Sequence, residues 1–181
     1  QTANQLYNSP WYDFQRGFIQ VGEVMAGNYF MGGSPYLTLT VNSSDKDIKN
    51  MSASLWSVNA YCNTLIKNVN EKAGAATTET VRNAVKGEAL TWKAMTYFYL
   101  VRSFGAVPII HENSELIGSN GYNDVYKAKT ENVYAYIIQT LEQAIEWLPE
   151  SAAAGRIDKY CAEGLLAKVY LTKSGLGLSG T

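Results

Sequence analysis

The chain has 181 residues, of which 46% are hydrophobic and 17% charged, with a formal net charge of −1 at pH 7. This length suffices for one domain with a substantial core. The near-neutral charge, without any basic cluster, excludes an electrostatic case for binding nucleic acid or an anionic membrane surface. No apolar run reaches the roughly 18 residues of a membrane-spanning helix.

The N-terminal quarter of the sequence predicts a polar arm followed by one helix. Residues 1–10 are polar, and from Trp11 to Met25 apolar residues recur at spacings of three and four, which is the helical period. Ser9 is suited to cap this helix, and Pro10 suits its first position.

A long segment without helical periodicity follows at residues 27–50. It contains Gly32, Gly33 and Pro35, and the weak alternation over 36–41 favours a short strand or extended segment. A connection of this length is unusual in a helical protein and is often functional.

The next two predicted helices cover 51–70 and 77–104. The second of these is apolar nearly all round, which predicts a buried helix with neighbours on several sides. Gly105 supplies its C-terminal stop, and Pro108 prevents continuation. We therefore expect the rest of the chain to pack around 77–104, with Trp92, Tyr97 and Phe98 in the core.

After Pro108, residues 112–129 show no periodicity, and two further amphipathic helices are predicted at 130–148 and 158–173. The helices then form two antiparallel pairs. The sequence predicts an all-α fold of tetratricopeptide-like stacked helix pairs with long irregular loops. Cys62 and Cys161 each fall in a predicted helix, where buried free thiols are expected; a disulfide between them is left open.

The central stretch also resembles a known family. The residues Gly87-Glu88-Ala89-Leu90, Ala94, Tyr97-Phe98, Leu100-Val101, Phe104-Gly105 and Val107-Pro108 resemble the SusD/RagB family of glycan-binding outer-membrane lipoproteins. Three further segments agree in the same order: Trp56 with Tyr61-Cys62-Asn63; Val133-Tyr134, Ile137, Leu141, Ala144 and Leu148-Pro149; and Gly155-Arg156, Ala162, Leu165-Leu166-Ala167 and Val169-Tyr170-Leu171.

The resemblance implies a cell-surface protein of Bacteroidetes-type bacteria, held on the outer membrane by an N-terminal lipid. It implies a protein that captures oligosaccharides or polysaccharides and passes them to a SusC-type TonB-dependent transporter, without catalysis, cofactor or metal. The sequence lacks the lipidated N-terminal cysteine and is much shorter than a complete member. We therefore expect residues 1–181 to be a single SusD-like N-terminal helical domain, as a fragment of a longer chain.

A neutral glycan site needs aromatic faces for stacking and amide or carboxylate groups for hydrogen bonds. The segment 27–50 supplies both, and in the resembled family a loop ahead of the Trp56-type helix contributes to the binding surface. The candidate ligand-binding residues are Asn28, Tyr29, Phe30, Tyr36, Asn42 and Asp45. The alternative for Tyr29, Phe30 and Tyr36 is that they pack the loop onto the core.

Other functional interpretations have weaker support in the sequence. Glu142 and Glu146 are spaced like a carboxylate pair but fall on the polar face of a predicted helix, and a single histidine, His111, supports neither a catalytic triad nor a histidine-rich metal site. Glu88 is expected to make local hydrogen bonds. An enzyme is therefore disfavoured, and the main alternative to glycan binding is a helical-repeat protein-interaction scaffold.

Overall fold

The computed structural model describes residues 2–8, 11, 13–118, 121 and 125–178. Seven α-helices and one π-helical turn lie in this part of the chain: α1 (Thr2–Gln5), α2 (Phe14–Ile19), η2 (Gln20–Val24), α3 (Lys46–Lys72), α4 (Glu79–Phe104), α5 (Asn113–Gly118), α6 (Thr130–Trp147) and α7 (Lys159–Gly175). The all-α prediction is confirmed, and the four long helices match the four predicted ranges with shifts at their ends.

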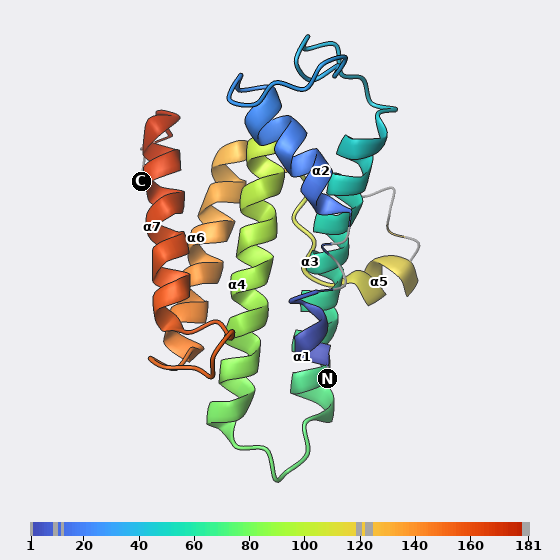
Figure 1. Cartoon of the computed structure of the whole chain (residues 1–181). Helices are drawn as coiled ribbons and strands as arrows, with labels where there is room; N and C mark the ends of the chain where they lie inside the picture. Colours follow the sequence, from blue (N-terminus) through green and yellow to red (C-terminus); the bar gives the residue numbers. More distant parts are fainter. Residues whose placement is uncertain (1, 9–10, 12, 119–120, 122–124, 179–181) are drawn as a thin grey trace.

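The four long helices pack as two antiparallel pairs, α3 with α4 and α6 with α7, and α4 contacts both α3 and α6. Figure 1 shows α3 and α4 joined by a tight turn at the lower end, with α6 and α7 following on the other side of α4. The main core contains Tyr97, Phe98 and Leu100 from α4 and Tyr134 and Ile137 from α6. A helix with apolar residues on most of its circumference is stable only where neighbours cover several sides, which is the position α4 occupies.

The two ends of α4 follow from local chemistry. The Thr78 side chain accepts a hydrogen bond from the Val81 amide at the N-terminus, and Gly105 ends the helix with a φ of 69°. That left-handed conformation suits glycine because it has no Cβ. Phe104, the last residue of α4, is 36% exposed.

The described part of the first ten residues, 2–8, does not form the expected polar arm. Leu6 is 1% exposed and packs with Val58 and Cys62 in a second apolar cluster, and the Trp11 indole donates a hydrogen bond to the Leu6 carbonyl oxygen at 2.7 Å. The sequence pattern missed this contact because one leucine in a polar segment has no periodicity. Ser9 and Pro10 lie outside the described residues.

The N-terminal segment is joined to the rest of the fold at a long-range ion pair, through Tyr7. Arg156, in the turn before α7, donates to both carboxylate oxygens of Glu88 on α4, at 3.0 and 2.6 Å. The Tyr7 hydroxyl donates to Glu88 and accepts from the Ile157 amide. The prediction of purely local hydrogen bonding for Glu88 is therefore wrong, because its partners lie far away in sequence.

Four other expectations are corrected. Residues 36–39 form turns and 40–41 have no regular structure, so no strand forms there. The segment after Pro108 contains the short helix α5, and an isolated bridge joins Val107 to Ala128. The helix expected over 11–25 begins at Phe14 and ends in the π-helical turn. Both cysteines are free, but only Cys62 is buried; Cys161 lies on the exposed side of α7, which has few neighbours.

Candidate functional site

Residues 25–45, which we call the 25–45 loop, connect η2 to α3 and form the upper end of the molecule in Figure 1. All six candidate residues lie in this loop or at its junction with α3. The helix α3 begins five residues before the predicted Met51, because Asp45 caps it. The Asp45 carboxylate accepts hydrogen bonds from the amides of Asp47 at 2.9 Å and Ile48 at 3.2 Å, which satisfies two otherwise unpaired helix donors.

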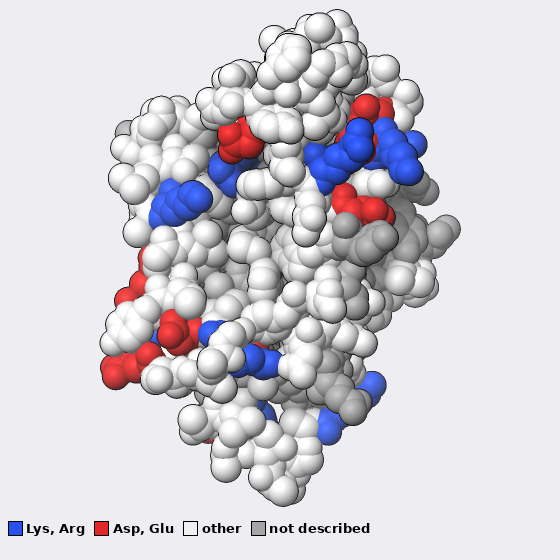
Figure 2. Space-filling model, in the orientation of Figure 1, with Lys and Arg blue, Asp and Glu red and all other residues white. Residues whose placement is uncertain are grey.

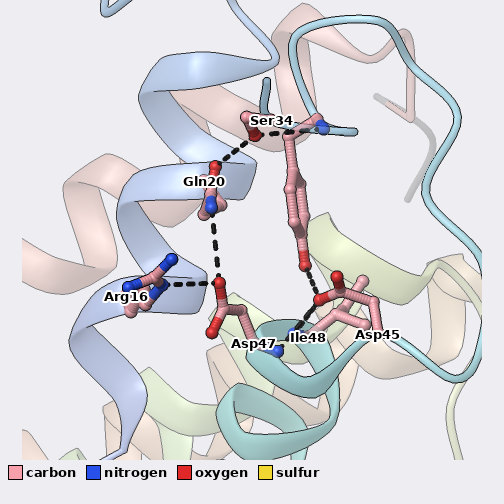
Figure 3. Close-up of polar contacts among 7 residues, drawn as sticks. Arg16, Gln20, Ser34, Asp45, Asp47 and Ile48 are labelled. Carbon is pink, nitrogen blue, oxygen red and sulfur yellow. Dashed lines mark hydrogen bonds and ion pairs between the residues drawn. The ribbon is translucent and has the colours of Figure 1, made fainter. Parts of the chain in front are cut away.

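A chain of polar contacts holds the base of the loop between α2 and α3 (Figure 3). The Arg16 guanidinium donates to Asp47 at 2.8 Å, and the Gln20 amide nitrogen donates to the same carboxylate oxygen at 3.3 Å. The Ser34 hydroxyl then donates to the Gln20 side-chain oxygen at 2.8 Å. The loop base is therefore fixed to two helices, although the loop has no regular secondary structure.

Tyr36 belongs to this base and not to the exposed surface. Its side chain is 0% exposed, and its hydroxyl donates to Asp45 at 2.5 Å. Burial and the Asp45 carboxylate raise the pKa of Tyr36 well above its ordinary value, while the hydrogen bond from Tyr36 lowers the pKa of Asp45. For Tyr36, the structure agrees with the alternative that it packs the loop onto the core.

Tyr29 and Phe30 differ sharply from Tyr36 in exposure. The Tyr29 side chain is 53% exposed and that of Phe30 is 78% exposed. The Phe30 ring lies near Gly32, where a built Cβ would be 3.6 Å from the ring, an ordinary van der Waals distance. Two adjacent aromatic side chains on an otherwise anchored loop provide the stacking faces that a sugar ring needs.

The two asparagines of the candidate set are also exposed. Asn28 donates from its side chain to Glu23 at 3.2 Å, and Asn42 accepts from the backbone amide of Ser44 at 2.9 Å. Asn28 directly precedes Tyr29 in sequence, whereas Asn42 lies on the returning part of the loop. The structure thus separates the set into an exposed group, Asn28, Tyr29, Phe30 and Asn42, and a base formed by Tyr36 and Asp45.

The sequence reasoning missed Gln20 and Ser34, which position the loop. They lie 14 residues apart, and Gln20 falls on a predicted helix whose polar residues carry no special pattern. A glutamine buried to 3% exposure is unusual, but that burial is not visible before the fold is known.

The charge distribution fits a neutral ligand at this end of the molecule. In the view of Figure 2, the uppermost part of the described surface shows neither Lys and Arg nor Asp and Glu side chains, and charged residues appear lower down, as scattered groups. A neutral oligosaccharide suits such a surface because it has no charge for the Glu23 carboxylate, which accepts from Asn28, to repel.

The residues considered for other chemistry have ordinary surroundings. Glu142 and Glu146 are exposed on α6, as expected for a solvated face, and the His111 ring packs edge-on against Tyr136 at 5.3 Å between ring centroids. Within the described ranges, no group of three His, Cys, Asp or Glu side chains is arranged to hold a metal ion. None of the helices in the described part of the chain has the length and apolar character needed to cross a bilayer.

Comparison with known proteins identifies relatives over nearly the whole chain. A SusD-like protein of Bacteroides ovatus is 30% identical over 180 residues, covering 97% of this chain and 32% of its own length. SusD-like protein P2 of Formosa agariphila is 36% identical over 92 residues, covering 50% of this chain and 18% of its own length.

Solved structures agree with the sequence relatives. A structure determined with a xylogluco-oligosaccharide has a TM-score of 0.84 and 28% identity, covering 96% of this chain and 34% of its own. A SusD superfamily protein from Parabacteroides distasonis has a TM-score of 0.79 and 27% identity, covering 96% of this chain and 39% of its own. The chain thus spans about a third of the length of most of these relatives.

The family profile described as "Starch-binding associating with outer membrane" matches residues 19–171. SusD-like proteins are non-catalytic binding proteins, in agreement with the prediction that this chain belongs to a binding protein and not to an enzyme. The match includes the 25–45 loop, the helices α3, α4 and α6, most of α7, and the central stretch that first suggested the resemblance. The chain therefore belongs to the SusD-like family of outer-membrane-associated glycan-binding proteins.

Proposed function

We propose that the protein captures oligosaccharides at the cell surface and passes them to a SusC-type TonB-dependent outer-membrane transporter, held to the outer membrane by an N-terminal lipid. One observation carries the sugar-binding part of the proposal: Tyr29 and Phe30, which are adjacent in sequence, are both exposed on a loop whose base is fixed to two helices. A fixed base lowers the entropy cost of ordering the loop on a ligand. The capture of glycans by the family supports the rest.

The contacting residues proposed here are Asn28, Tyr29, Phe30 and Asn42. Tyr36 and Asp45 act beneath them, as positioning residues that hold the loop against the start of α3. Sugar rings present C–H faces to the aromatic side chains and hydroxyl groups to the amides, which both donate and accept hydrogen bonds. That residues 1–181 form one domain of a longer protein stays a prediction.

The test compares binding of a xylogluco-oligosaccharide by the protein and by a variant that carries Tyr29→Ala and Phe30→Ala, measured by isothermal titration calorimetry. This ligand is a suitable first probe because a similar structure was solved with it. Loss of two aromatic contacts of about 1 kcal/mol each weakens binding by about thirtyfold. The matched control is Tyr160→Ala, which removes a tyrosine 60% exposed on α7, outside the loop.

If other neutral glycans are bound more tightly than the xylogluco-oligosaccharide, the same pair of variants applies to them. Unchanged affinity of the double variant for every glycan that the protein binds would remove the 25–45 loop from the site.

The protein-interaction scaffold remains the second candidate because the structure contains one feature in its favour. The outer side of α7 exposes Tyr160, Tyr170 and Leu171, at 60%, 46% and 75%. Exposed apolar side chains gathered on one helix are typical of an interface. A protein that binds no glycan, with or without the loop substitutions, would favour this second function.

A further inference from the structure

A second cavity lies away from the 25–45 loop, between α3, α4 and α6. It has a volume of about 360 Å³, and its lining combines the apolar side chains of Ile66 and Leu90 with polar and aromatic ones, among them Asn63, Lys93, His111, Tyr136, Gln139 and Trp147. We call it the Lys93 pocket. Its volume falls within the range of about 300–1,000 Å³ that is common for small-molecule sites.

Lys93 is the unusual member of this lining. It lies in the middle of α4 and is only 4% exposed, and its ammonium donates to the Asn63 side-chain oxygen at 2.6 Å. Among the described residues, no carboxylate pairs with it. Burial lowers the pKa of Lys93 to about 8, so that most molecules still carry the charge at pH 7.

The orientation of Asn63 is fixed by its other partners. Its amide nitrogen donates to the Ile110 carbonyl oxygen at 3.2 Å and to the Asn113 side-chain oxygen at 2.7 Å. The Asn63 oxygen therefore faces Lys93. This neutral contact engages one of the three ammonium donors and leaves a buried cation without an anion, an arrangement that costs free energy unless a counter-charge is supplied.

The remainder of the lining indicates what kind of ligand could supply that charge. The Tyr136 ring centroid lies 5.7 Å from the Lys93 ammonium, whereas Trp147 lines the pocket further along α6 and has the Lys86 ammonium 4.3 Å from its ring centroid. Gln139 is exposed at the side of α6 and offers an amide that donates and accepts. None of the lining side chains is acidic; Glu142 and Glu146 of α6 are exposed, and Glu146 accepts from Gln143.

We propose that the Lys93 pocket binds a uronic acid residue, with the sugar carboxylate on the Lys93 ammonium and the sugar ring against Tyr136 and Gln139. A carboxylate on a buried ammonium makes a charge-assisted hydrogen bond, and an aromatic side chain accepts the C–H face of a pyranose. The sugar part of this inference rests on the proposed function, whereas the carboxylate part rests on Lys93 alone.

The first experiment titrates the unaltered protein with D-glucuronate, its methyl ester and D-glucose, using NMR or calorimetry. We expect glucuronate to bind at least about tenfold more tightly than the two neutral sugars, because only glucuronate carries the charge. Equal binding of the three sugars, or no binding of glucuronate, overturns the proposal. Preferential binding of a short peptide with a free C-terminal carboxylate, relative to its amide, overturns the sugar assignment.

The second experiment places the ligand. Lys93→Met is expected to weaken glucuronate binding at least about tenfold and to leave the weak binding of glucose unchanged. The matched control is Lys168→Met, which removes an exposed lysine on α7. Unchanged glucuronate affinity in Lys93→Met overturns the proposal.

A third variant covers the outcome in which Lys93→Met does not fold. Gln139→Glu replaces an exposed side chain at the pocket and adds a negative charge that repels a carboxylate. Glucuronate binding is therefore expected to fall more than glucose binding, and an equal change for the two sugars overturns the proposal. The variant with Tyr29→Ala and Phe30→Ala is expected to keep its glucuronate affinity. Failure of the 25–45 loop as a glycan site is thereby distinguished from failure of the Lys93 pocket.

Discussion

Gly17 lies where α2 touches α3, and its replacement by alanine tests how the loop is positioned. A Cβ built on Gly17 would lie 2.6 Å from the Asp47 carbonyl oxygen and 2.6 Å from the Met51 Cβ. Carbon contacts are comfortable at about 3.5–4.0 Å, so α2 would have to move away from α3 by about 1 Å. The Asp47 atom at this contact is the backbone carbonyl oxygen, which no side-chain rotation can move away.

The magnitude follows from two opposing effects. Alanine gains about 1 kcal/mol over glycine from helix propensity, while overpacking at a closed contact costs about 1–3 kcal/mol. The 3.3 Å hydrogen bond from Gln20 to Asp47 would also lengthen beyond a useful distance. We expect Gly17→Ala to lower the free energy of unfolding by about 1–2 kcal/mol and to weaken glycan binding, because Gln20 holds Ser34.

The control is Gly164→Ala, at a helical glycine on α7 with no neighbouring atom within 4 Å of a built Cβ. It is expected to raise stability by up to about 1 kcal/mol and to leave glycan affinity unchanged. Urea unfolding followed by circular dichroism gives both free energies, and calorimetry gives the affinities. If the two variants have the same free energy of unfolding, the reasoning that α2 and α3 are in close contact at Gly17 is refuted.

Three further predictions concern buried polar groups. Glu88→Gln leaves the positively charged Arg156 without a counter-charge, and should lower the free energy of unfolding, measured in urea, by about 2 kcal/mol. Glu163→Gln, at an exposed pair 4.0 Å apart, should change it by less than about 0.5 kcal/mol. Equal costs would refute a structural role for the buried pair. Burial lowers the pKa of Lys93 from 10.5 to about 8 in the folded state, so above pH 8 the unfolded chain binds more protons than the folded chain. The contribution of Lys93 to the free energy of unfolding should therefore increase by about 1 kcal/mol as the pH rises from 7 to 9. Lys93→Met should lose that rise, and an identical pH profile would contradict the burial of the ammonium. Tyr36→Phe keeps the buried ring but removes the donor to Asp45, so thermal unfolding should show a loss of about 1 kcal/mol, and no change would mean that the hydroxyl does not hold the loop.

The sequence by itself determined the helices and their order, because apolar residues at the helical period need a buried face wherever they occur. The stop at Gly105 and Pro108 and the uniformly apolar character of 77–104 were enough to make this helix the centre of the fold. The same stretch carried the family resemblance, since its motif is continuous in sequence.

Only the tertiary structure decided which aromatic side chains of the loop are available to a ligand. Tyr29, Phe30 and Tyr36 lie within eight positions of one another without periodicity. The burial of Tyr36 goes with two contacts that form only in the folded chain: its hydroxyl donates to Asp45, and its amide donates to Ser34, which Gln20 holds in place. The same reason applies to Leu6 in the first ten residues. A segment without a repeating pattern has no preferred face, and contacts between distant residues determine which side chains become buried.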